Sequence, residues 1–471
     1  MTTDIITSLS PPRIDASADI AVIGAGACGL VTALRARFAG ADVIVVERDA
    51  SPLGSTSMSS GFVPAAGTRF QRAIGIEDDT PELLAKDIMA KSKTKSVPHL
   101  VELACETIGP ALEWLSDEHG IDWIVLDDFL YPGHSRHRMH AVAEKTGEAL
   151  LARLYAAAQS ADIDLITDAR ASRLFVDDDC RVLAVAVERP DGQSEFIGCG
   201  ALILACNGFG GNAELVRTHI PEIAEGLYYG HAGNTGDAVL WGEALGAKLE
   251  HLTGYQGHGS LAQPHGILIS WAIMMEGGIQ VNAMGKRFSN ENAGYSEQAM
   301  HVLAQPSGIA WNIYDQHIHE FALSFPDYKE AVKAGAIRDA ADIAGLAKVT
   351  GLPEQALAET LGEVTRFQEG KVPDVFGRNF TVKPGLRAPF HAVKVTGALF
   401  HTQGGLMIDK EARVVDQTSK PFPNLFAGGG AACGVSGPEA SGYLSGNGLL
   451  TAIAFGFIAG STAGGAINPS E

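Results

Sequence analysis

Residues 18–47 read ADIAVIGAGACGLVTALRARFAGADVIVVE. An apolar strand leads into a glycine-rich turn, a helix follows over Leu30–Ala39, and a second strand, Asp42–Val46, ends at Glu47. A switch from strand to helical periodicity and back across a Gly-rich turn is typical of a βαβ unit. The stretch therefore predicts an α/β fold with a Rossmann-type parallel sheet.

The turn of this unit has the chemistry of a dinucleotide site. Glycines at the N-terminus of a helix let backbone amides approach a pyrophosphate, and an acid about 20 residues further on accepts hydrogen bonds from a ribose 2′-hydroxyl. An acid there also argues against the 2′-phosphate of NADP. A merely tight packing turn is the alternative. The predicted contacts are Gly24, Gly26, Ala27, Cys28, Gly29, Glu47 and Arg48.

Composition narrows the class of protein. The 471 residues contain 35 Lys and Arg against 55 Asp and Glu, a formal charge of -20, which argues against a nucleic-acid partner. The six cysteines are scattered without a Cys-x-x-Cys pair, so we expect no metal site and a reduced, cytoplasmic protein. Residues 1–19 lack the apolar core of an export signal. Residues 449–467 are apolar but rich in Gly and Ala, so we expect a buried helix and no membrane span.

Patterning along the chain predicts two domains. Helical periodicity covers 81–114 and 146–160, and residues 184–189 and 196–206 read as paired strands. Residues 251–385 change to short helices and loops, and the Gly/Ala-rich style of the N-terminal third returns afterwards. We therefore expect a discontinuous first domain, 1–250 and 386–471, with a second domain, 251–385, inserted into it.

Five strings further along the chain resemble the fumarate reductase and succinate dehydrogenase flavoprotein superfamily. They occur in the family's order at Ser55–Thr68, Ala205–Gly210, Asn234–Asp237, His401–Asp409 and Asn424–Gly429. Each is a loose glycine pattern, but five in order are specific. The resemblance implies FAD rather than NAD, bound by the first domain, with an inserted α+β capping domain over the isoalloxazine. It adds as cofactor contacts Ser55, Thr56, Ser57, Ser60, Gly61, Ala66, Gly67, Cys206, Asn207, Gly208, Thr235, Asp237, Gly404, Gly429, Gly430, Asn447 and Leu449.

Two departures from the family concern the cofactor. Members that bind FAD through histidine carry that histidine in the first string, whereas Thr56, Ser57 and their neighbours are not histidine. The resemblance therefore implies noncovalent FAD. Gly430 stands where the family usually has an acid after its Ala-Gly pair, so one ribityl contact is missing from the pattern.

Two further departures concern the substrate. In fumarate-type members an arginine in an Asn-Glu-x-x-x-Arg string donates the proton, and a second arginine clamps a carboxylate before a Leu-Gly-Gly-Asn turn. These positions are Tyr295, in the string 290–295, and Tyr443, before Leu444-Ser-Gly-Asn447. A guanidinium forks onto a carboxylate, whereas a phenol is neutral and suits a carbonyl oxygen. The ketosteroid dehydrogenase branch of the superfamily uses tyrosines in this way. The alternative is that both rings only fill core or cap positions.

Three more residues are candidates by resemblance. His258 and His401 match histidines that hold the substrate carbonyl or carboxylate in fumarate-type members, and Tyr131 could be a third phenol, as the steroid branch has one from its first domain. Each histidine could instead be a satisfied core residue.

Two polar clusters look like sites at first. Residues 134–140 contain His134, Arg136, His137, Arg138 and His140, and residues 316–320 contain alternating histidines. Because no carboxylate or cysteine stands at ligand spacing, we interpret the first as a loop of solvated cations. We interpret the second as a polar face of the cap.

The sequence thus predicts an FAD-dependent oxidoreductase that moves a hydride between flavin N5 and the carbon β to a carbonyl, with tyrosine handling the α-proton. The substrate would be a ketone or an enone, in either direction, with an unknown electron partner. Two alternatives remain open: a fumarate-like reductase of unsaturated carboxylates, and a non-catalytic flavin-binding redox sensor.

Overall fold

The computed structural model describes residues 6–7 and 10–467, which form two compact units. Unit 1 comprises the chain up to Ile220, Gly230–Tyr255 and the chain from His401 onward. Unit 2 comprises Pro221–Tyr229 and Gln256–Phe400. The expected limits were 250/251 and 385/386. The limits found at 255/256 and 400/401 both fall inside strands, which are described below.

Unit 1 is built on a mixed sheet whose centre is parallel. β2 (Ala16–Ile23) pairs in parallel with β3 (Val43–Val46) and with β10 (Ser194–Leu204). Its last residues are fully or nearly buried, as expected for a strand covered on both faces. The other strands of this sheet are β1 (Ile6–Thr7), β7 (Asp164–Ile166), β8 (Arg170–Val176), β9 (Val182–Glu188), β20 (Arg413–Val415) and β21 (Pro421–Ala427).

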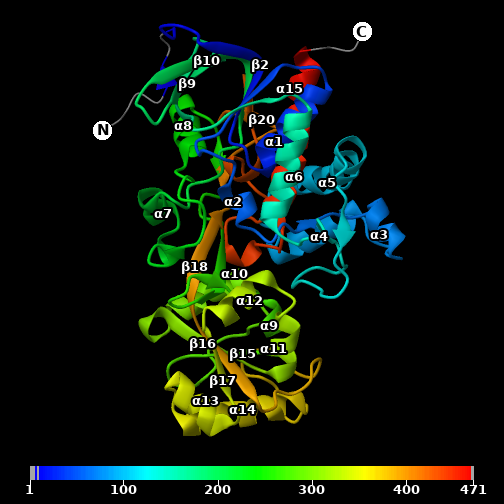
Figure 1. Cartoon of the computed structure of the whole chain (residues 1–471), viewed down its shortest axis with the longest axis vertical. Coiled ribbons are helices and arrows are strands. Elements are labelled where there is room, and N and C mark those ends of the chain that lie inside the picture. Colours follow the sequence, from blue (N-terminus) through cyan, green and yellow to red (C-terminus); the bar gives the residue numbers. More distant parts are fainter. Residues whose placement is uncertain (1–5, 8–9, 468–471) are drawn as a thin grey trace. The chain divides into compact units, whose positions relative to one another are not determined.

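The helices of unit 1 surround this sheet (Figure 1). They are α1 (Ala27–Phe38), α2 (Gly54–Ser57), α3 (Arg69–Ala73), α4 (Pro81–Lys91), α5 (Pro98–His119), α6 (Gly147–Ser160), α7 (Ala213–His219), α8 (Asp237–Leu245) and α15 (Asn447–Ile467). Short strands accompany them: β4 (Val63–Pro64), β5 (Ile124–Val125), β6 (Met139–Ala141), β12 (Leu249–Glu250) and β19 (Gly405–Leu406). The predicted first βαβ unit is therefore β2–α1–β3, within a few residues of its expected bounds.

Helices α1 and α15 lie side by side (Figure 1), and glycines of α15 face the backbone of α1. A Cβ on Gly456 would lie 2.6 Å from the carbonyl oxygen of Cys28, and one on Gly460 would lie 2.4 Å from that of Thr32. Glycines four residues apart share one helix face, so this stripe permits the close approach. By length and composition α15 could cross a bilayer, but 61% of its apolar window is buried in the structure. It packs as a core helix of unit 1.

Unit 2 has its own sheet, in the order β14 (Ile267–Leu268), β13 (Tyr255–Ala262), β18 (Phe390–Thr402), β16 (Ile309–Asp315), β15 (Ile279–Val281). β11 (Leu227–Tyr228) and β17 (Ile337–Ala340) also pair with β18. Its helices are α9 (Ala272–Met275), α10 (Tyr295–Leu303), α11 (Gln316–Ala322), α12 (Pro326–Lys333), α13 (Ile343–Thr350) and α14 (Glu354–Gln368). Two apolar clusters form its core. Unit 2 is thus an α+β domain, as expected.

Candidate active site

The glycine-rich turn between β2 and α1 admits no side chain at two of its three glycines. Gly24 has φ +104°, and a Cβ there would lie 2.5 Å from the carbonyl oxygen of Ala205. A Cβ on Gly29 would lie 1.8 Å from the carbonyl oxygen of Gly24. At Gly26, in contrast, a Cβ would meet only the Thr56 hydroxyl, at 3.5 Å. Gly26 is therefore free of protein contacts that demand glycine.

Glu47, at the end of β3, is held by this turn. Its carboxylate accepts hydrogen bonds from the backbone N–H groups of Ala25 (2.8 Å) and Asp49 (3.1 Å). The acid expected at a ribose is thus fixed in orientation beside the turn. Nearby, the Thr56 hydroxyl accepts from the N–H of Ala27 at 3.0 Å, and the Arg48 guanidinium donates to the carbonyl of Gly233.

Three of the predicted strings meet at Ser55. Its hydroxyl oxygen accepts from the side-chain amides of Asn207 (2.8 Å) and Asn234 (2.9 Å). The other end of the Asn207 amide accounts for the missing acid at position 430, since a Cβ on Gly430 would lie 2.0 Å from Asn207 Oδ1. In this chain the asparagine amide fills the space beside residue 430, so a side chain there would have to displace that amide.

The remaining predicted cofactor contacts also belong to unit 1. Thr235 donates a hydrogen bond to Asp237 at 2.9 Å, and a Cβ on Gly404 would lie 2.1 Å from the carbonyl of His251. Ser60 is exposed, and burial raises the pKa of the Cys28 and Cys206 thiols to about 12. The rest occupy turns or helix ends: Ser57, Gly61, Ala66, Gly67, Gly208, Gly429, Asn447 and Leu449. Their cofactor roles stay predictions.

Two features of unit 1 fit a bound dinucleotide. The N-cap residue Gly26 supplies no side-chain cap, and although Thr56 takes the N–H of Ala27, the other amides of the first turn can face a phosphate. Asn447, fully buried at the start of α15, donates through Nδ2 to Ser436, but its Oδ1 has no hydrogen-bond partner among the described residues. A buried amide oxygen usually finds a donor, so an N–H of a bound cofactor would satisfy it.

His401 and Tyr443 lie together in unit 1. Their ring centroids are 5.4 Å apart and the planes are nearly perpendicular, at 78°. A Cβ placed on Gly448 would lie 3.1 Å from His401 Nε2 and 3.7 Å from the Tyr443 hydroxyl. Both polar atoms therefore lie beside Gly448, where any side chain would crowd the His401 ring.

Both side chains of this pair are uncharged at neutral pH. Removal from water lowers the pKa of His401 to about 4, against a hydrogen bond with Thr402 that acts in the other direction. Burial raises the pKa of Tyr443 well above its ordinary value. Tyr443 is therefore a phenol that donates a hydrogen bond, and not a phenolate base.

The third candidate phenol, Tyr131, packs among aromatic rings in unit 1. Its ring contacts Phe129 and Phe62 edge-on, with centroids 4.7 and 6.1 Å apart. Burial raises its pKa, so it too stays protonated. Three residues on, the buried His134 ring contacts the carbonyl of Ser445 at 3.0 Å and so ties the Tyr131 loop to the segment after Tyr443.

Tyr295 and His258 lie together in unit 2. Tyr295 begins α10, and its ring stacks on His258 with centroids 4.9 Å apart and planes 27° apart. Phe400 stacks on His258 at 5.1 Å. Burial lowers the pKa of His258 to about 3. His258 Nδ1 accepts from the backbone N–H of Ser260 at 3.1 Å, so the ring is neutral and carries its proton on Nε2.

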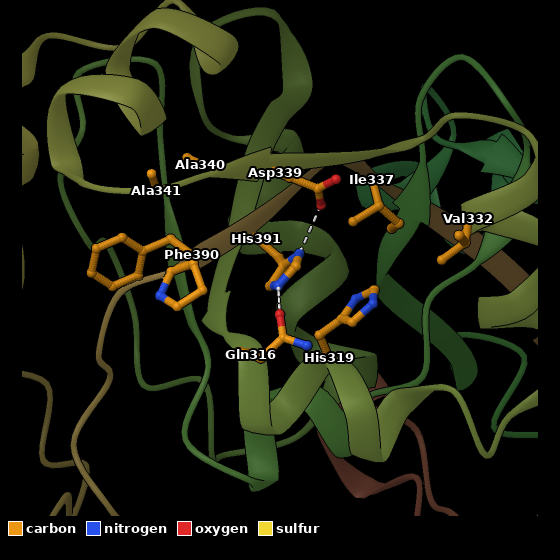
Figure 2. Close-up of a pocket in the computed structure, with 10 residues that line it drawn as sticks. Gln316, His319, Val332, Ile337, Asp339, Ala340, Ala341, Phe390 and His391 are labelled. Carbon is orange, nitrogen blue, oxygen red and sulfur yellow. Dashed lines mark hydrogen bonds and ion pairs between the residues drawn. The ribbon is translucent and has the colours of Figure 1, made fainter.

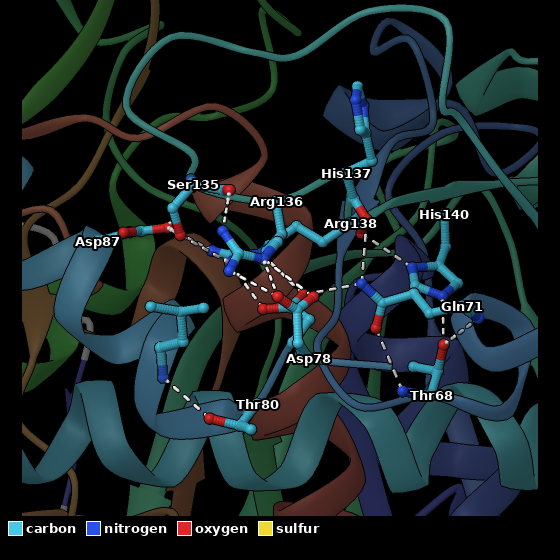
Figure 3. A network of polar contacts seen from close by, with 12 residues as sticks. Thr68, Gln71, Asp78, Thr80, Asp87, Ser135, Arg136, His137, Arg138 and His140 are labelled. Carbon is cyan, nitrogen blue, oxygen red and sulfur yellow. Dashed lines mark hydrogen bonds and ion pairs between the residues drawn. The ribbon is translucent and has the colours of Figure 1, made fainter. Parts of the chain in front are cut away.

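The cluster 134–140 is not a loop of solvated cations, so that interpretation is wrong for most of it (Figure 3). Arg138 is 1% exposed and pairs with Asp79 and Asp87, both at 2.7 Å. His134 and His140 are buried. Within this cluster, Arg136 forms the ion pair that is exposed to solvent, with Asp78. The carboxylates were missed because they lie about 50 to 60 positions earlier in the sequence.

A cavity of about 620 Å³ in unit 2 lies among none of the predicted site residues (Figure 2). His319, from the second polar cluster, stacks there on His391 with centroids 4.1 Å apart. His391 also contacts Asp339 and Gln316, at 2.8 and 2.9 Å. The polar face expected at 316–320 is therefore partly an internal ring contact. Within the described residues no group of three His, Cys, Asp or Glu could hold a metal ion.

Sequence reasoning missed three residues that contact the candidates. Gln403 and Ser436 connect His401 to Asn447 through hydrogen bonds, and Trp271 meets His258 edge-on at 5.9 Å. Gln403 lies inside a string that the resemblance singled out, and a polar residue two positions after the histidine was the available signal. Ser436 and Trp271 carried none, because only the folded chain brings them to these side chains.

Comparisons with known proteins agree with this arrangement. The FAD binding domain family matches residues 19–449. A probable fumarate reductase of Shewanella frigidimarina is 30% identical over 94% of this chain and 74% of its own. A urocanate reductase of Eggerthella lenta is 27% identical over 96% of this chain and 76% of its own. A 4-oxocyclohexanecarboxylate 2-dehydrogenase of Sinomonas cyclohexanicum is 26% identical over 95% of this chain and 93% of its own.

Solved structures give the same result for the fold. An open flavocytochrome c3 fumarate reductase matches with a TM-score of 0.80 and 28% identity, over 96% of this chain and 78% of the other. A ketosteroid dehydrogenase of Rhodococcus jostii matches with a TM-score of 0.76 and 24% identity, over 96% of this chain and 98% of the other. The chain therefore belongs to the FAD binding domain family, among the fumarate reductase and succinate dehydrogenase flavoproteins, which are oxidoreductases acting on CH–CH bonds.

Proposed function

We propose that this protein reduces a C=C bond conjugated to an uncharged carbonyl group, or forms that bond in the reverse direction. The observation that carries the proposal is the neutral pair His401 and Tyr443, whose rings contact each other and whose polar atoms both lie beside Gly448. Two uncharged donors suit a carbonyl oxygen on which negative charge develops during the reaction. A carboxylate, in contrast, is held best by the fork of a guanidinium.

Four arginines that lie near the candidate residues in sequence, or are buried in the same unit, are already engaged in ion pairs. In unit 2, Arg287 pairs with Glu291 and Asp374 at 2.7 Å, and Arg378 pairs with Glu291 at 3.1 Å. In unit 1, Arg138 and Arg136 pair with aspartates, as described above. Arg387 is exposed. These pairings support an uncharged substrate group, because a buried guanidinium that is already neutralised gains little from a second carboxylate.

Noncovalent FAD, when bound, supplies hydride transfer at N5. In the reducing direction the carbon β to the carbonyl gains the hydride, and the carbon α to it gains a proton, so two hydrogens are added. Tyr443 and His401 would hold the carbonyl oxygen throughout. We assign the α-proton to Tyr295 in unit 2, whose phenol replaces the family's proton-donating arginine.

A second candidate is a reductase of unsaturated carboxylates. Relatives named for fumarate, urocanate and acrylate support it, and they are more similar in sequence to this chain than the 4-oxocyclohexanecarboxylate 2-dehydrogenase is. That support is stronger than the relatives give to an uncharged carbonyl. The residues at the two family arginine positions favour the first candidate, so substrate charge is the property to test.

The purified protein should be yellow, and heat or acid should release its flavin into the supernatant. The reason is that residues 55–68 contain no histidine to form a covalent link. Flavin absorbance before and after removal of the precipitate measures this. Flavin that stays with the denatured chain would contradict noncovalent binding.

Gly26→Val should abolish FAD retention while the protein stays folded. Its φ of −75° suits any residue and a Cβ there has room, so only a pyrophosphate at this helix N-terminus would be displaced. Gly465→Val, at another open glycine of unit 1, is the control. Flavin content per folded chain decides, with circular dichroism reporting folding. Normal flavin in Gly26→Val would mean that the pyrophosphate lies elsewhere.

Reduced enzyme, kept free of oxygen, should be reoxidised by 2-cyclohexen-1-one and not by millimolar fumarate or acrylate. The enone offers the neutral pair an uncharged carbonyl, whereas the acids lack a guanidinium partner. Tyr443→Phe should slow the enone reaction by on the order of 100-fold, because one donor to the oxyanion is lost. Faster reoxidation by fumarate or acrylate than by the enone would establish the second candidate instead.

Tyr295→Phe should slow reduction of the enone by on the order of 100-fold with normal flavin content, because the ring stays and only the proton donor is lost. Tyr328→Phe removes a hydroxyl that bonds Tyr314 and His319 in the same unit, and it is the matched control. Stopped-flow flavin absorbance gives both rates. Wild-type turnover in Tyr295→Phe would assign the proton to another group.

A further inference from the structure

Gln403 lies between His401 and Ser436 in unit 1 and is 6% exposed. The oxygen of its side-chain amide faces Ser436, and the nitrogen faces His401. Gln403 Oε1 lies 2.6 Å from the Ser436 hydroxyl, and Gln403 Nε2 lies 2.9 Å from His401 Nδ1. The amide is thus the link between the imidazole and the hydroxyl.

The direction of these hydrogen bonds follows from Asn447, which lies at the other end of this series of hydrogen-bonded side chains. Asn447 Nδ2 donates to the Ser436 oxygen at 3.0 Å, so the single proton of the Ser436 hydroxyl is free to point at Gln403 Oε1. With its oxygen occupied in this way, Gln403 presents its NH₂ to His401 Nδ1. A ring nitrogen that accepts a hydrogen bond carries no proton. His401, being neutral, then holds its proton on Nε2.

One other group competes for His401 Nδ1. The backbone carbonyl of Thr402 lies 3.3 Å away and would accept a proton from Nδ1. That distance exceeds the usual range for an N–H···O bond, about 2.7 to 3.2 Å, whereas the Gln403 contact lies within it. The carbonyl also belongs to the adjacent residue, so the covalent chain alone keeps it near the ring. The Gln403 amide therefore decides the tautomer.

We propose that Gln403 is a positioning residue that fixes His401 as the Nε2–H tautomer, so that His401 and Tyr443 donate two hydrogen bonds to one carbonyl oxygen. This inference rests on the proposed function. His401 Nε2 and the Tyr443 hydroxyl both lie beside Gly448. In the opposite tautomer the Nε2 lone pair would face the lone pairs of the carbonyl, and one of the two donors would become a repulsive group.

An isosteric substitution at residue 403 reverses the direction of its hydrogen bond with His401 Nδ1. In Gln403→Glu both carboxylate oxygens are acceptors, so the oxygen facing His401 Nδ1 requires a proton there. Gln159→Glu, on the exposed face of α6, adds the same charge without touching the site and is the control. Ser436→Ala removes the hydroxyl that orients the amide, without any change in charge.

The decisive measurement is the protonation of the His401 ring nitrogens in the holoenzyme labelled with ¹⁵N-histidine, assigned by comparison with His401→Gln. We expect an unprotonated Nδ1 and a protonated Nε2 in the wild type and in Gln159→Glu, and a protonated Nδ1 in Gln403→Glu. A wild-type ring protonated on Nδ1 would overturn the proposal. This readout needs no substrate, so it stands whether or not the proposed function holds.

The second measurement is the rate at which 2-cyclohexen-1-one reoxidises the reduced holoenzyme. Gln403→Glu should lower it by on the order of 100-fold with unchanged flavin content, and Ser436→Ala should lower it less. A reversed tautomer with a wild-type rate would overturn the link between Gln403 and the carbonyl. If the wild type does not reduce the enone at all, the proposed function fails, and the ring-nitrogen measurement alone decides the role of Gln403.

Discussion

The turn between β2 and α1 packs backbone against backbone, and this close contact is the constraint on which the proposed dinucleotide site depends. A Cβ on Gly29 would lie 1.8 Å from the carbonyl of Gly24, and one on Gly24 would lie 2.5 Å from that of Ala205. In the same turn the Glu47 carboxylate accepts from the N–H of Ala25 and the Thr56 hydroxyl accepts from that of Ala27, so both side chains are held beside Gly26. Glycines also allow close backbone contact where α15 lies on α1. Close backbone contact thus sets where a dinucleotide can lie.

The candidate chemistry depends on a different property, the absence of net charge on the groups that would meet substrate. Burial keeps His401 and His258 neutral and keeps Tyr443 protonated. The buried arginines of the described chain are paired within their own units, where Arg287 and Arg378 share Glu291. An uncharged donor set binds a carbonyl oxygen without the cost of desolvating an ion. It also gives no advantage to a dianion in a protein of formal charge -20.

Sequence reasoning predicted what short-range pattern controls. The βαβ unit was placed within a few residues, and the family resemblance, with its fold and flavin, was confirmed by the comparisons. It failed where distant segments meet. Arg138 was interpreted as solvated because Asp79 and Asp87 lie far away in the sequence. The second unit ends at Phe400 and not at the expected residue 385, because most of strand β18 (Phe390–Thr402) belongs to it. Gln403 was passed over because its partner Ser436 is 33 positions away.

The central claim is that two neutral donors polarise one substrate carbonyl. The most direct measurement is the infrared carbonyl stretch of ¹³C-labelled 2-cyclohexen-1-one bound to the oxidised holoenzyme, taken as a difference against the unlabelled ligand. Two donors should lower the frequency below its value in water, and Tyr443→Phe should recover part of that shift. A bound carbonyl with its aqueous frequency, unchanged in Tyr443→Phe, would contradict the account.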